Sequence, residues 1–356
     1  MNLEVIKTRE NFIEIKKDWN ALKSKLDYYT PYQTWEWNYL YWNHFGTNKD
    51  LQIVTVRNKD NLLAIFPFVI RNQFGFKILE PIGTRGTDYI NILIDPIHHN
   101  EILSIFFDWF INNDIDLINM EDIPSTASYL NTLQECSLKL NLFENVNYTY
   151  CPCFSINLPD SWDSYLQILS NRAKNDIKYY RRYCSKEFKQ ILYIQGKSSD
   201  IDKHYELHQK SRQIKNDAGT YKSQTVKDFI NEYAIFSETE NMLRLVFLSL
   251  NNNIVASILG IEDANKRYNI SIGYDPDYRK YRPGSILYGY DIEDCIKRRI
   301  FHYDLSRGLD AYKIRMGTKK NFNIRAIISK RMNNISEYLH LNASYMRGRD
   351  YAPSGI

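Results

Sequence analysis

Residues 275–320 gather acidic, basic and phenolic side chains around one predicted helix start and one predicted strand end. Apolar residues recur at three- and four-residue spacings over 284–300, which predicts a helix there. A Pro283-Gly284 turn leads into this helix. A helix start presents unpaired backbone N–H groups and the positive end of the helix dipole, and this combination suits a phosphate group. The alternative is an ordinary helix start closed by a Pro-Gly turn.

The strand predicted after this helix carries polar side chains that could meet a substrate. An apolar run over 300–305 indicates a buried strand, which ends in Asp304-Leu305-Ser306-Arg307-Gly308. In an open α/β sheet, ligands bind at the ends of strands. We therefore expect Asp304 and Arg307 to lie beside the phosphate. The alternative is a salt bridge between these two residues that fixes the turn.

Two patterns in this region resemble a known family. Y-x-x-x-x-P-G-x-x-L and, after the helix, D-x-x-R-G-x-x-x-Y-K resemble the acetyltransferase family of the cellulose-biosynthesis protein CelD, within the GNAT acyltransferase superfamily. The matching residues are Tyr278, Pro283, Gly284, Leu287, Asp304, Arg307, Gly308, Tyr312 and Lys313. One residue departs from the superfamily's Q/R-x-x-G-x-G/A loop, because Arg282 stands where the first glycine belongs.

The resemblance implies a co-substrate and the residues that hold it. GNAT enzymes bind the pyrophosphate of acyl-CoA at this helix start, so we expect acetyl-CoA or another acyl-CoA as co-substrate, and no metal. The residues expected to bind it are Arg279, Arg282, Gly284, Ser285, Ile286 and Leu287.

Acyl transfer to an amine sets requirements for the catalytic residues. The amine must lose a proton, and the sulfur leaving group needs an acid, for which a tyrosine is a usual GNAT choice. Asp304 is the candidate base or anchor for the substrate amine, and Tyr312 is the candidate acid. Arg307 and Lys313 are expected to hold a phosphate or carboxylate of the substrate.

Three more residues are candidates for substrate binding. Asp88-Tyr89 resembles a D-Y pair of the family just before a strand, although the glycines near it also fit a plain turn. Arg172 belongs to a basic face on a helix predicted from Trp162 to Cys184. A solvated face is the simpler interpretation of these charges, and a contact with phosphates is the alternative.

The elements that position these residues alternate between strands and helices, which indicates an α/β fold. The hairpins that begin at Leu51 and Leu243 align without a gap, with Ala64 on Ala256, so we expect a duplicated domain rather than a chance match. The resemblance implies two tandem GNAT-like domains, each a mixed sheet flanked by helices. We expect an N-terminal domain at 1–150, an acyltransferase domain at 151–345 and a short tail at 346–356.

Composition excludes several classes of protein. The formal net charge of +4 is too small to indicate DNA binding, and no apolar run is long enough to span a membrane. Five cysteines and an N-terminus unlike a secretory signal favour the cytoplasm. His204 and His208 lie one helical turn apart without an evident third ligand, so we expect packed histidines rather than a metal site.

These observations lead to one main functional hypothesis and two alternatives. We expect an acyl-CoA-dependent N-acyltransferase, acetyl in the first instance, that acts on an amino sugar or another cell-envelope or polysaccharide precursor. The acceptor would be a small molecule or a nucleotide-linked sugar. The alternatives are a FemX-like aminoacyltransferase that takes its acyl group from aminoacyl-tRNA, and a non-catalytic binding module on a GNAT fold. The oligomeric state stays open.

Overall fold

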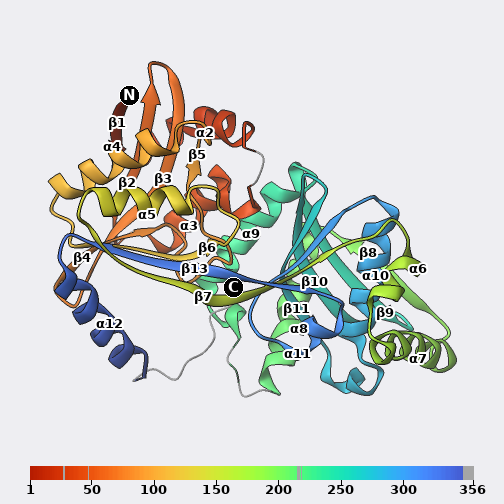
Figure 1. Ribbon diagram of the computed structural model, residues 1–356. Coiled ribbons are helices and arrows are strands. Elements are labelled where there is room, and N and C mark those ends of the chain that lie inside the picture. Colours follow the sequence, from red (N-terminus) through yellow and green to blue (C-terminus); the bar gives the residue numbers. More distant parts are fainter. Residues whose placement is uncertain (27–28, 47, 215–216, 218, 348–356) are drawn as a thin grey trace. The chain divides into compact units, whose positions relative to one another are not determined.

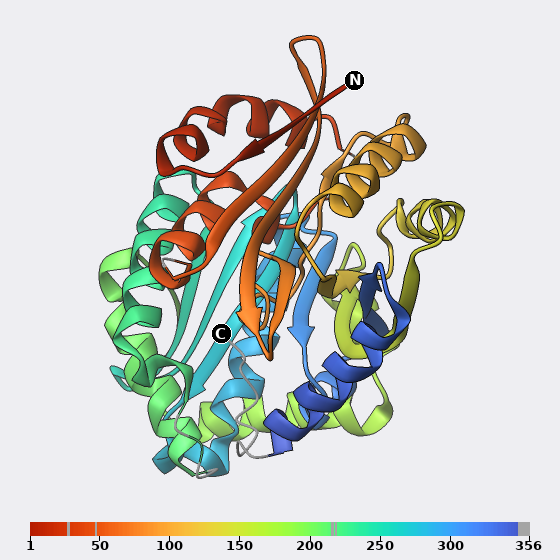
Figure 2. The ribbon, with the colours of Figure 1, turned by 90° about the vertical axis from the view of Figure 1, so that its left-hand side faces the viewer.

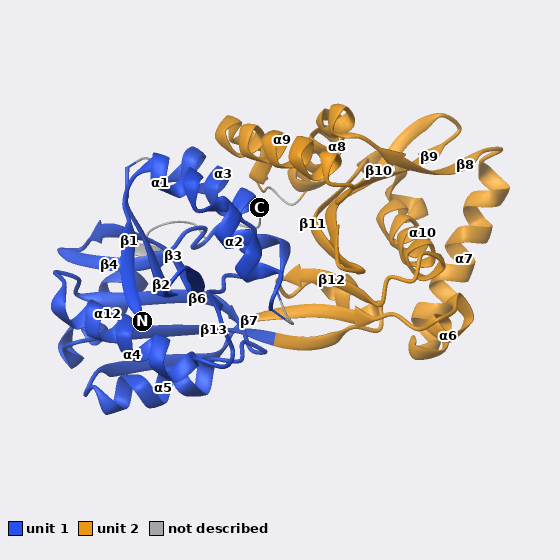
Figure 3. Cartoon of the chain, turned by 90° about the horizontal axis from the view of Figure 1, so that it is seen from above, with its two compact units in different colours: residues 1–151, 322–353 blue, residues 152–321, 354–356 orange. Residues whose placement is uncertain are grey.

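The computed structural model describes residues 1–26, 29–46, 48–214, 217 and 219–347, which form two compact units (Figure 3). Of the described residues, the first unit comprises 1–151 and those from 322 onward, and the second comprises 152–321. Of the tail expected at 346–356, residues 348–356 lie outside the described part.

The first unit contains a mixed sheet with the strand order β1-β2-β3-β4-β6-β13 (Figure 1). Neighbouring strands are antiparallel except β4 and β6, which are parallel. Its elements are β1 (Asn2–Ile6), α1 (Arg9–Glu14), α2 (Lys16–Lys23), α3 (Trp35–Phe45), β2 (Asp50–Asn58), β3 (Asn61–Gln73), β4 (Phe76–Pro81), β5 (Leu93–Ile94), α4 (His99–Asn112), β6 (Leu117–Pro124), α5 (Leu130–Lys139), the first part of β7 (Phe143–Asn157), most of β13 (Lys319–Ser329), and α12 (Met332–Arg347).

The second unit repeats this arrangement, with the strand order β8-β9-β10-β11-β12-β7 and a parallel pair only between β11 and β12. The fold class predicted from the sequence, two mixed sheets each flanked by helices, is therefore confirmed. Its elements are α6 (Trp162–Ile168), α7 (Asn171–Glu187), β8 (Ile191–Gly196), α8 (Ile201–Gln213), α9 (Gln224–Thr239), β9 (Leu243–Leu250), β10 (Asn253–Asp263), β11 (Lys266–Tyr274), the 3₁₀ helix η4 (Pro276–Tyr281), α10 (Pro283–Lys297), β12 (His302–Arg307) and α11 (Ala311–Arg315).

Two details differ from the sequence-based expectations. The expected second domain extended to residue 345, whereas β13 pairs from Asn323 onward with β6 of the first unit. The helix expected from Trp162 to Cys184 is interrupted, because the side chain of Ser170 accepts a hydrogen bond from the N–H of Ala173 and begins α7 as a separate helix.

The hairpins β2–β3 and β9–β10 occupy equivalent places in the two sheets, and Figure 2 shows the first of them in orange. Each second strand has one extra residue, Leu63 in β3 and Val255 in β10, just before the aligned alanine. A β-bulge at the same aligned position is a specific feature rather than a general property of hairpins. The sequence-based prediction of a duplicated hairpin is therefore confirmed.

The carbonyl oxygens of the two bulged residues are also used in the same way. Leu63 accepts a hydrogen bond from the N–H of Asp95, and Val255 accepts one from the N–H of Asp275, at 2.8 Å in both cases. A proline follows each of these aspartates in the sequence. Asp95 and Asp275 therefore occupy equivalent positions in the two units. Each lies after a strand that pairs with the hairpin and before the next helix, α4 or α10.

The units differ in the strand that follows the hairpin. In the second unit β11 pairs with β10 over its whole length, from Lys266 to Tyr274. In the first unit the equivalent strand is interrupted, because β4 and β5 pair with different parts of β3 and residues 82–92 leave the sheet between them.

Helices cover both faces of the second sheet. An added Cβ on Gly284 of α10 would lie 3.3 Å from Ile272 of β11, whereas one on Gly273 would meet the backbone of α8. Successive residues of a strand point to opposite faces, so α10 and α8 lie on opposite sides of β11. Leu287 is fully buried where α10 packs on the sheet.

Candidate functional site

The two parallel strands of the second sheet separate beyond a short paired region. β11 and β12 pair only from Lys266–His302 to Tyr268–Asp304. Beyond that point each strand has one extra residue relative to its other neighbour, at Ile270 in β11 and between Asp304 and Arg307 in β12. Bulges bend strands and increase their twist, which explains why the pairing ends here.

Polar groups lie where the strands separate. The hydroxyl of Ser306, a residue with a φ of 60°, donates to the carbonyl of Asn269 at 2.6 Å. The side chain of Asn269 is 4% exposed, and neither its amide nitrogen nor its amide oxygen has a hydrogen-bond partner within the described part of the chain. A buried amide without partners is costly, so we expect a ligand or a water molecule to supply them.

The N-terminus of α10 follows a tight turn and leaves backbone N–H groups without a partner in the helix. Asp275 accepts a hydrogen bond from the N–H of Asp277 and begins η4, and Arg282 follows in the left-handed conformation, with a φ of 51°. The first N–H that bonds within α10 is that of Ile286, which donates to the carbonyl of Arg282. Proline at 283 has no N–H to offer. The N–H groups of Gly284 and Ser285 come before that of Ile286, and they therefore have no acceptor inside the helix.

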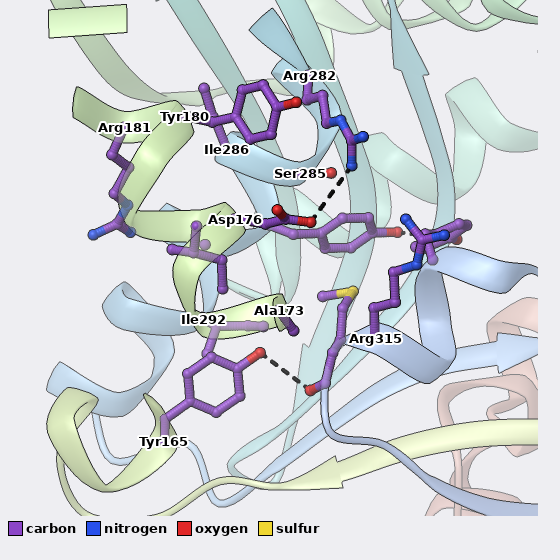
Figure 4. A pocket seen from close by; sticks show the side chains of 15 residues that line it. Tyr165, Ala173, Asp176, Tyr180, Arg181, Arg282, Ser285, Ile286, Ile292 and Arg315 are labelled. Carbon is purple, nitrogen blue, oxygen red and sulfur yellow. Dashed lines mark hydrogen bonds and ion pairs between the residues drawn. The ribbon is translucent and has the colours of Figure 1, made fainter. Parts of the chain in front are cut away.

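A pocket opens between α7, α10 and α11 (Figure 4). Its lining joins apolar and aromatic side chains to three arginines and one carboxylate: Tyr165, Ala173, Asp176, Ile177, Tyr180, Arg181, Arg282, Ser285, Ile286, Tyr288, Gly289, Ile292, Tyr312, Arg315 and Met316. Such a mixture suits a ligand with an apolar arm and an anionic group.

Arg282 and Arg181 differ in how firmly they are held. A nitrogen of the Arg282 guanidinium lies 3.8 Å from a carboxylate oxygen of Asp176, and the side chain is 43% exposed. Arg181 is more enclosed, because its guanidinium lies against the rings of Trp162 and Tyr290 and donates to Glu293 at 2.8 Å. We conclude that Arg282 is available to a ligand, whereas Arg181 fastens α7 to α10.

Two tyrosines form one side of the pocket. The rings of Tyr288 and Tyr312 stack with centroids 5.6 Å apart, and their hydroxyl oxygens are separated by 3.3 Å. Burial raises the pKa of Tyr312 to about 12 and raises that of Tyr288 well above its ordinary value. Both phenols therefore hold their protons at neutral pH.

The end of β12 is held by its own side chains. Asp304 is buried and accepts a hydrogen bond from the N–H of Ser306 at 2.6 Å, and its other oxygen lies 3.5 Å from the ring nitrogen Nε2 of His302. The ammonium group of Lys313 is also buried, and it donates to the carbonyls of Arg307 at 2.6 Å and Ser306 at 3.4 Å.

The structure brings only some of the residues chosen from the sequence into the pocket. Arg282, Ser285, Ile286 and Tyr312 line it. Gly284 and Leu287 instead pack α10 against the sheet, and the side chains of Arg279 and Arg172 are exposed outside the lining. Asp304 and Arg307 belong to β12 and Lys313 to α11, and none of the three lines the pocket.

Asp88 and Tyr89 lie in the first unit, in the segment 82–92 that interrupts its sheet, and both are buried. A carboxylate oxygen of Asp88 accepts from the hydroxyl of Tyr32 at 3.4 Å, and its carbonyl accepts from the side chain of Asn323 at 2.7 Å. These contacts fix the segment to its own unit.

Sequence reasoning missed several pocket residues on α7. Ala173, Asp176, Ile177, Tyr180 and Arg181 recur at three- and four-residue spacings, which from the sequence alone indicate only that they share one side of a helix. The same stripe packs on α10 and also lines the pocket. Spacing reports that a helix face is covered but does not distinguish a neighbouring helix from a ligand.

His204 and His208 are packed inside the second unit. Both are buried, and the two ring nitrogens of His204 contact the hydroxyls of Ser257 and Ser271 at 2.9 and 2.7 Å. Across the described ranges, no three His, Cys, Asp or Glu side chains are placed to hold a metal ion together. Among the described helices, none is long and apolar enough to cross a membrane.

Comparison with known proteins places the second unit in a recognised class. Residues 171–314 match the family described as "Acetyltransferase (GNAT) domain". A comparison with curated proteins returns no match. The second unit thus contains a GNAT-type acetyltransferase domain, and the resemblance to the GNAT superfamily is confirmed at that level.

Solved structures show the same fold over almost the whole chain. The structure described as "Crystal structure of FemX" has a TM-score of 0.66 at 9% identity and covers 95% of this chain and 100% of its own. A conserved protein of unknown function from Bacteroides thetaiotaomicron has a TM-score of 0.56 at 10% identity, covering 92% and 100%. A tandem GNAT protein from the clavulanic acid biosynthesis pathway has a TM-score of 0.51 at 7% identity, covering 92% and 98%. At these identities the likeness establishes the fold, which is the tandem GNAT fold.

Proposed function

We propose that the second unit is an acyl-CoA-dependent N-acyltransferase that transfers an acetyl or other acyl group to an amine. The observation that carries this proposal is the separation of β11 and β12 beyond Tyr268–Asp304, next to the open N-terminus of α10. A separated strand pair has free backbone groups for an extended arm and for an oxyanion, and the helix start has donors for a phosphate.

The first unit provides an internal comparison. Where α10 begins after η4, Arg282 and Pro283, α4 begins only four residues after Asp95 and has no such turn. In the first unit the N–H of Ile90 donates to the carbonyl of Asp122, the left-handed bulge residue of β6. The chain's own segment 82–92 therefore contacts the position equivalent to the separated strands. These features support a donor site in the second unit.

The residues of the second unit supply the remaining chemistry. Acyl-CoA would supply an activated thioester, with its pyrophosphate on the N–H groups of Gly284 and Ser285 and on the guanidinium of Arg282. Tyr312 would donate a proton to the leaving sulfur. Asp304 would accept the proton of the amine or hold the amine in place, since it is the carboxylate nearest the point where the strands part.

For the acceptor we propose an amino sugar or another cell-envelope or polysaccharide precursor, as the resemblance to the CelD-like family implies. That family membership remains a prediction. The competing function is a FemX-like transfer from aminoacyl-tRNA, and the basic character of α7 is the observation that favours it, with six lysines and arginines against two acidic residues.

The test separates the two donors. The protein is titrated with acetyl-CoA, and thiol release is then followed with a panel of free and nucleotide-linked amino sugars. We expect saturable binding of acetyl-CoA and acceptor-dependent thiol release. A protein that binds a charged tRNA but not acetyl-CoA would refute the proposed donor, and one that binds neither would be a non-catalytic module.

A further inference from the structure

A strip of aromatic and basic side chains lies on α7 beside η4. The α7–η4 strip consists of Tyr179, Arg182, Tyr183 and Lys186 of α7 and Tyr281 of η4. The side chain of Tyr179 is 51% exposed, and its ring stacks on that of Tyr183 with centroids 5.9 Å apart and planes at 21°. The ring of Tyr183 lies 5.3 Å from that of Tyr281, a buried residue that packs beneath the rest of the strip and joins α7 to η4.

Arg182 and Lys186 supply the positive charges of the strip. Arg182 and Lys186 are exposed, and among the described residues neither forms an ion pair. Each lies three residues after a tyrosine of the strip, which places it beside that ring on the helix surface. Arg181 and Arg282 on the pocket side, in contrast, both contact carboxylates. The strip thus offers an aromatic platform and two uncommitted positive charges.

The strip is continuous with the pocket. The ring of Tyr179 meets that of Tyr180 edge to face at 5.1 Å, and Tyr180 lines the pocket. The guanidinium of Arg282, another lining residue, lies 4.9 Å from the centre of the Tyr180 ring. If the diphosphate of a ligand lies against Arg282, the group attached to that diphosphate can therefore contact the strip.

We infer that the strip binds the 3′-phosphorylated adenosine end of the acyl donor, with the adenine on Tyr179 and the 3′-phosphate between Arg182 and Lys186. This inference rests on the proposed function, because the adenosine of an acyl-CoA is the group attached to its diphosphate. Every base has a π-face that stacks on an aromatic ring, and arginine and lysine suit a phosphate. A merely solvated helix face would account for the lysines and arginines but not for an exposed tyrosine whose ring stacks on that of a second tyrosine.

The experiment compares three probes on the full chain by isothermal titration: CoA, dephospho-CoA, which lacks the 3′-phosphate, and adenosine 3′,5′-bisphosphate. We expect the unmodified protein to bind CoA about tenfold more tightly than dephospho-CoA. Arg182→Gln combined with Lys186→Gln should remove that difference and leave dephospho-CoA affinity unchanged. Tyr179→Leu should weaken all three probes about tenfold.

Two matched controls exclude a general effect of surface changes. Tyr148 of the first unit is 52% exposed, much like Tyr179, and Lys222 is an exposed lysine of the second unit outside the strip. Tyr148→Leu and Lys222→Gln should change none of the affinities. A melting curve for every variant confirms that it is folded.

The outcomes distinguish this inference from the proposed function. If the protein binds CoA and dephospho-CoA equally, or if the strip variants bind as the unmodified protein does, the strip is not the adenosine site and the donor assignment stands. If CoA fails to bind at all, both fail. If a single-stranded RNA ending in adenosine binds in a way that requires Tyr179 while CoA does not bind, the strip serves RNA and the inference is overturned.

Discussion

Arg282 offers the sharpest test of where the donor diphosphate binds. Arg282 and Arg279 belong to the same turn and were both expected to contact it, but only Arg282 lines the pocket. Arg282→Gln should therefore weaken CoA binding, whereas Arg279→Gln, a matched loss of charge three residues away, should leave it nearly unchanged. The pair separates a specific contact from a general loss of positive charge.

The magnitude follows from the surroundings of the guanidinium. A charge-assisted hydrogen bond to phosphate contributes about 1.5–3 kcal/mol when it is well shielded from water. The side chain of Arg282 is 43% exposed, so solvent screening favours the lower limit, which is about tenfold in affinity. Asp176 competes for the same guanidinium at 3.8 Å. Asp176→Asn should therefore leave CoA affinity unchanged or strengthen it by a few fold.

The backbone of Arg282 adds a second readout. Its φ of 51° is a left-handed conformation that costs a residue with a Cβ about 1–2 kcal/mol and costs glycine almost nothing. Arg282→Gly should accordingly raise the melting temperature while it lowers CoA affinity as Arg282→Gln does. The assay is isothermal titration with CoA at two salt concentrations, together with thermal unfolding. Equal effects of Arg279→Gln and Arg282→Gln, or weaker binding by Asp176→Asn, would refute the placement of the diphosphate.

Three further predictions concern catalysis and the end of β12. Asp304→Asn should lower the rate of thiol release by about two to four orders of magnitude without a change in melting temperature if Asp304 acts as base, and full turnover would contradict that role. Tyr312→Phe should lower turnover with CoA affinity intact. Because the pKa of Tyr312 rises from 10.0 to about 12 on folding, the stability of the unmodified protein relative to Tyr312→Phe should be constant below pH 10 and fall between pH 10 and 12, as thermal unfolding across that range would show. Lys313→Met should destabilise the protein by about 1–3 kcal/mol in chemical denaturation, since the carbonyls of Ser306 and Arg307 lose their donor, and an unchanged midpoint would contradict this.

The sequence predicted the frame of the second unit well because its signals are local. The Pro283-Gly284 turn, the helical spacing behind it and the apolar run before Arg307 each depend on neighbours within a few residues, and α10 and β12 form close to where they were expected. The gap-free alignment of the hairpins also corresponds to a shared structural detail. The bulges at Leu63 and Val255 both lie one residue before the aligned alanines.

Other features depend on contacts between residues far apart in the sequence. No sequence signal near Tyr288 indicates that its ring stacks on that of Tyr312. The two rings belong to α10 and α11, and the intervening strand β12 brings these helices together. The resemblance implies that Lys313 holds a substrate, and in the structure its ammonium group donates to two backbone carbonyls and lies 3.7 Å from a carboxylate oxygen of Asp310. A lysine after a strand end is compatible with both roles, and only the path of the backbone decides between them.

The two units together indicate what duplication preserved and what it changed. Both keep the bulge before the aligned alanine, the aspartate-proline step and a left-handed residue in the strand that pairs in parallel, Asp122 in β6 and Ser306 in β12. These features shape a sheet with a separated strand pair. In the first unit the N–H of Ile90 donates to the carbonyl of Asp122, and in the second the ammonium group of Lys313 donates to the carbonyl of Ser306 at 3.4 Å. Each unit therefore satisfies this carbonyl with its own chain, the first through the backbone of the segment 82–92 and the second through a side chain of α11. The side-chain amide of Asn269 in β11 is a separate group, and it has no hydrogen-bond partner among the described residues. Because a buried polar group is stable only when it is hydrogen-bonded, we expect a ligand or a water molecule to contact this amide.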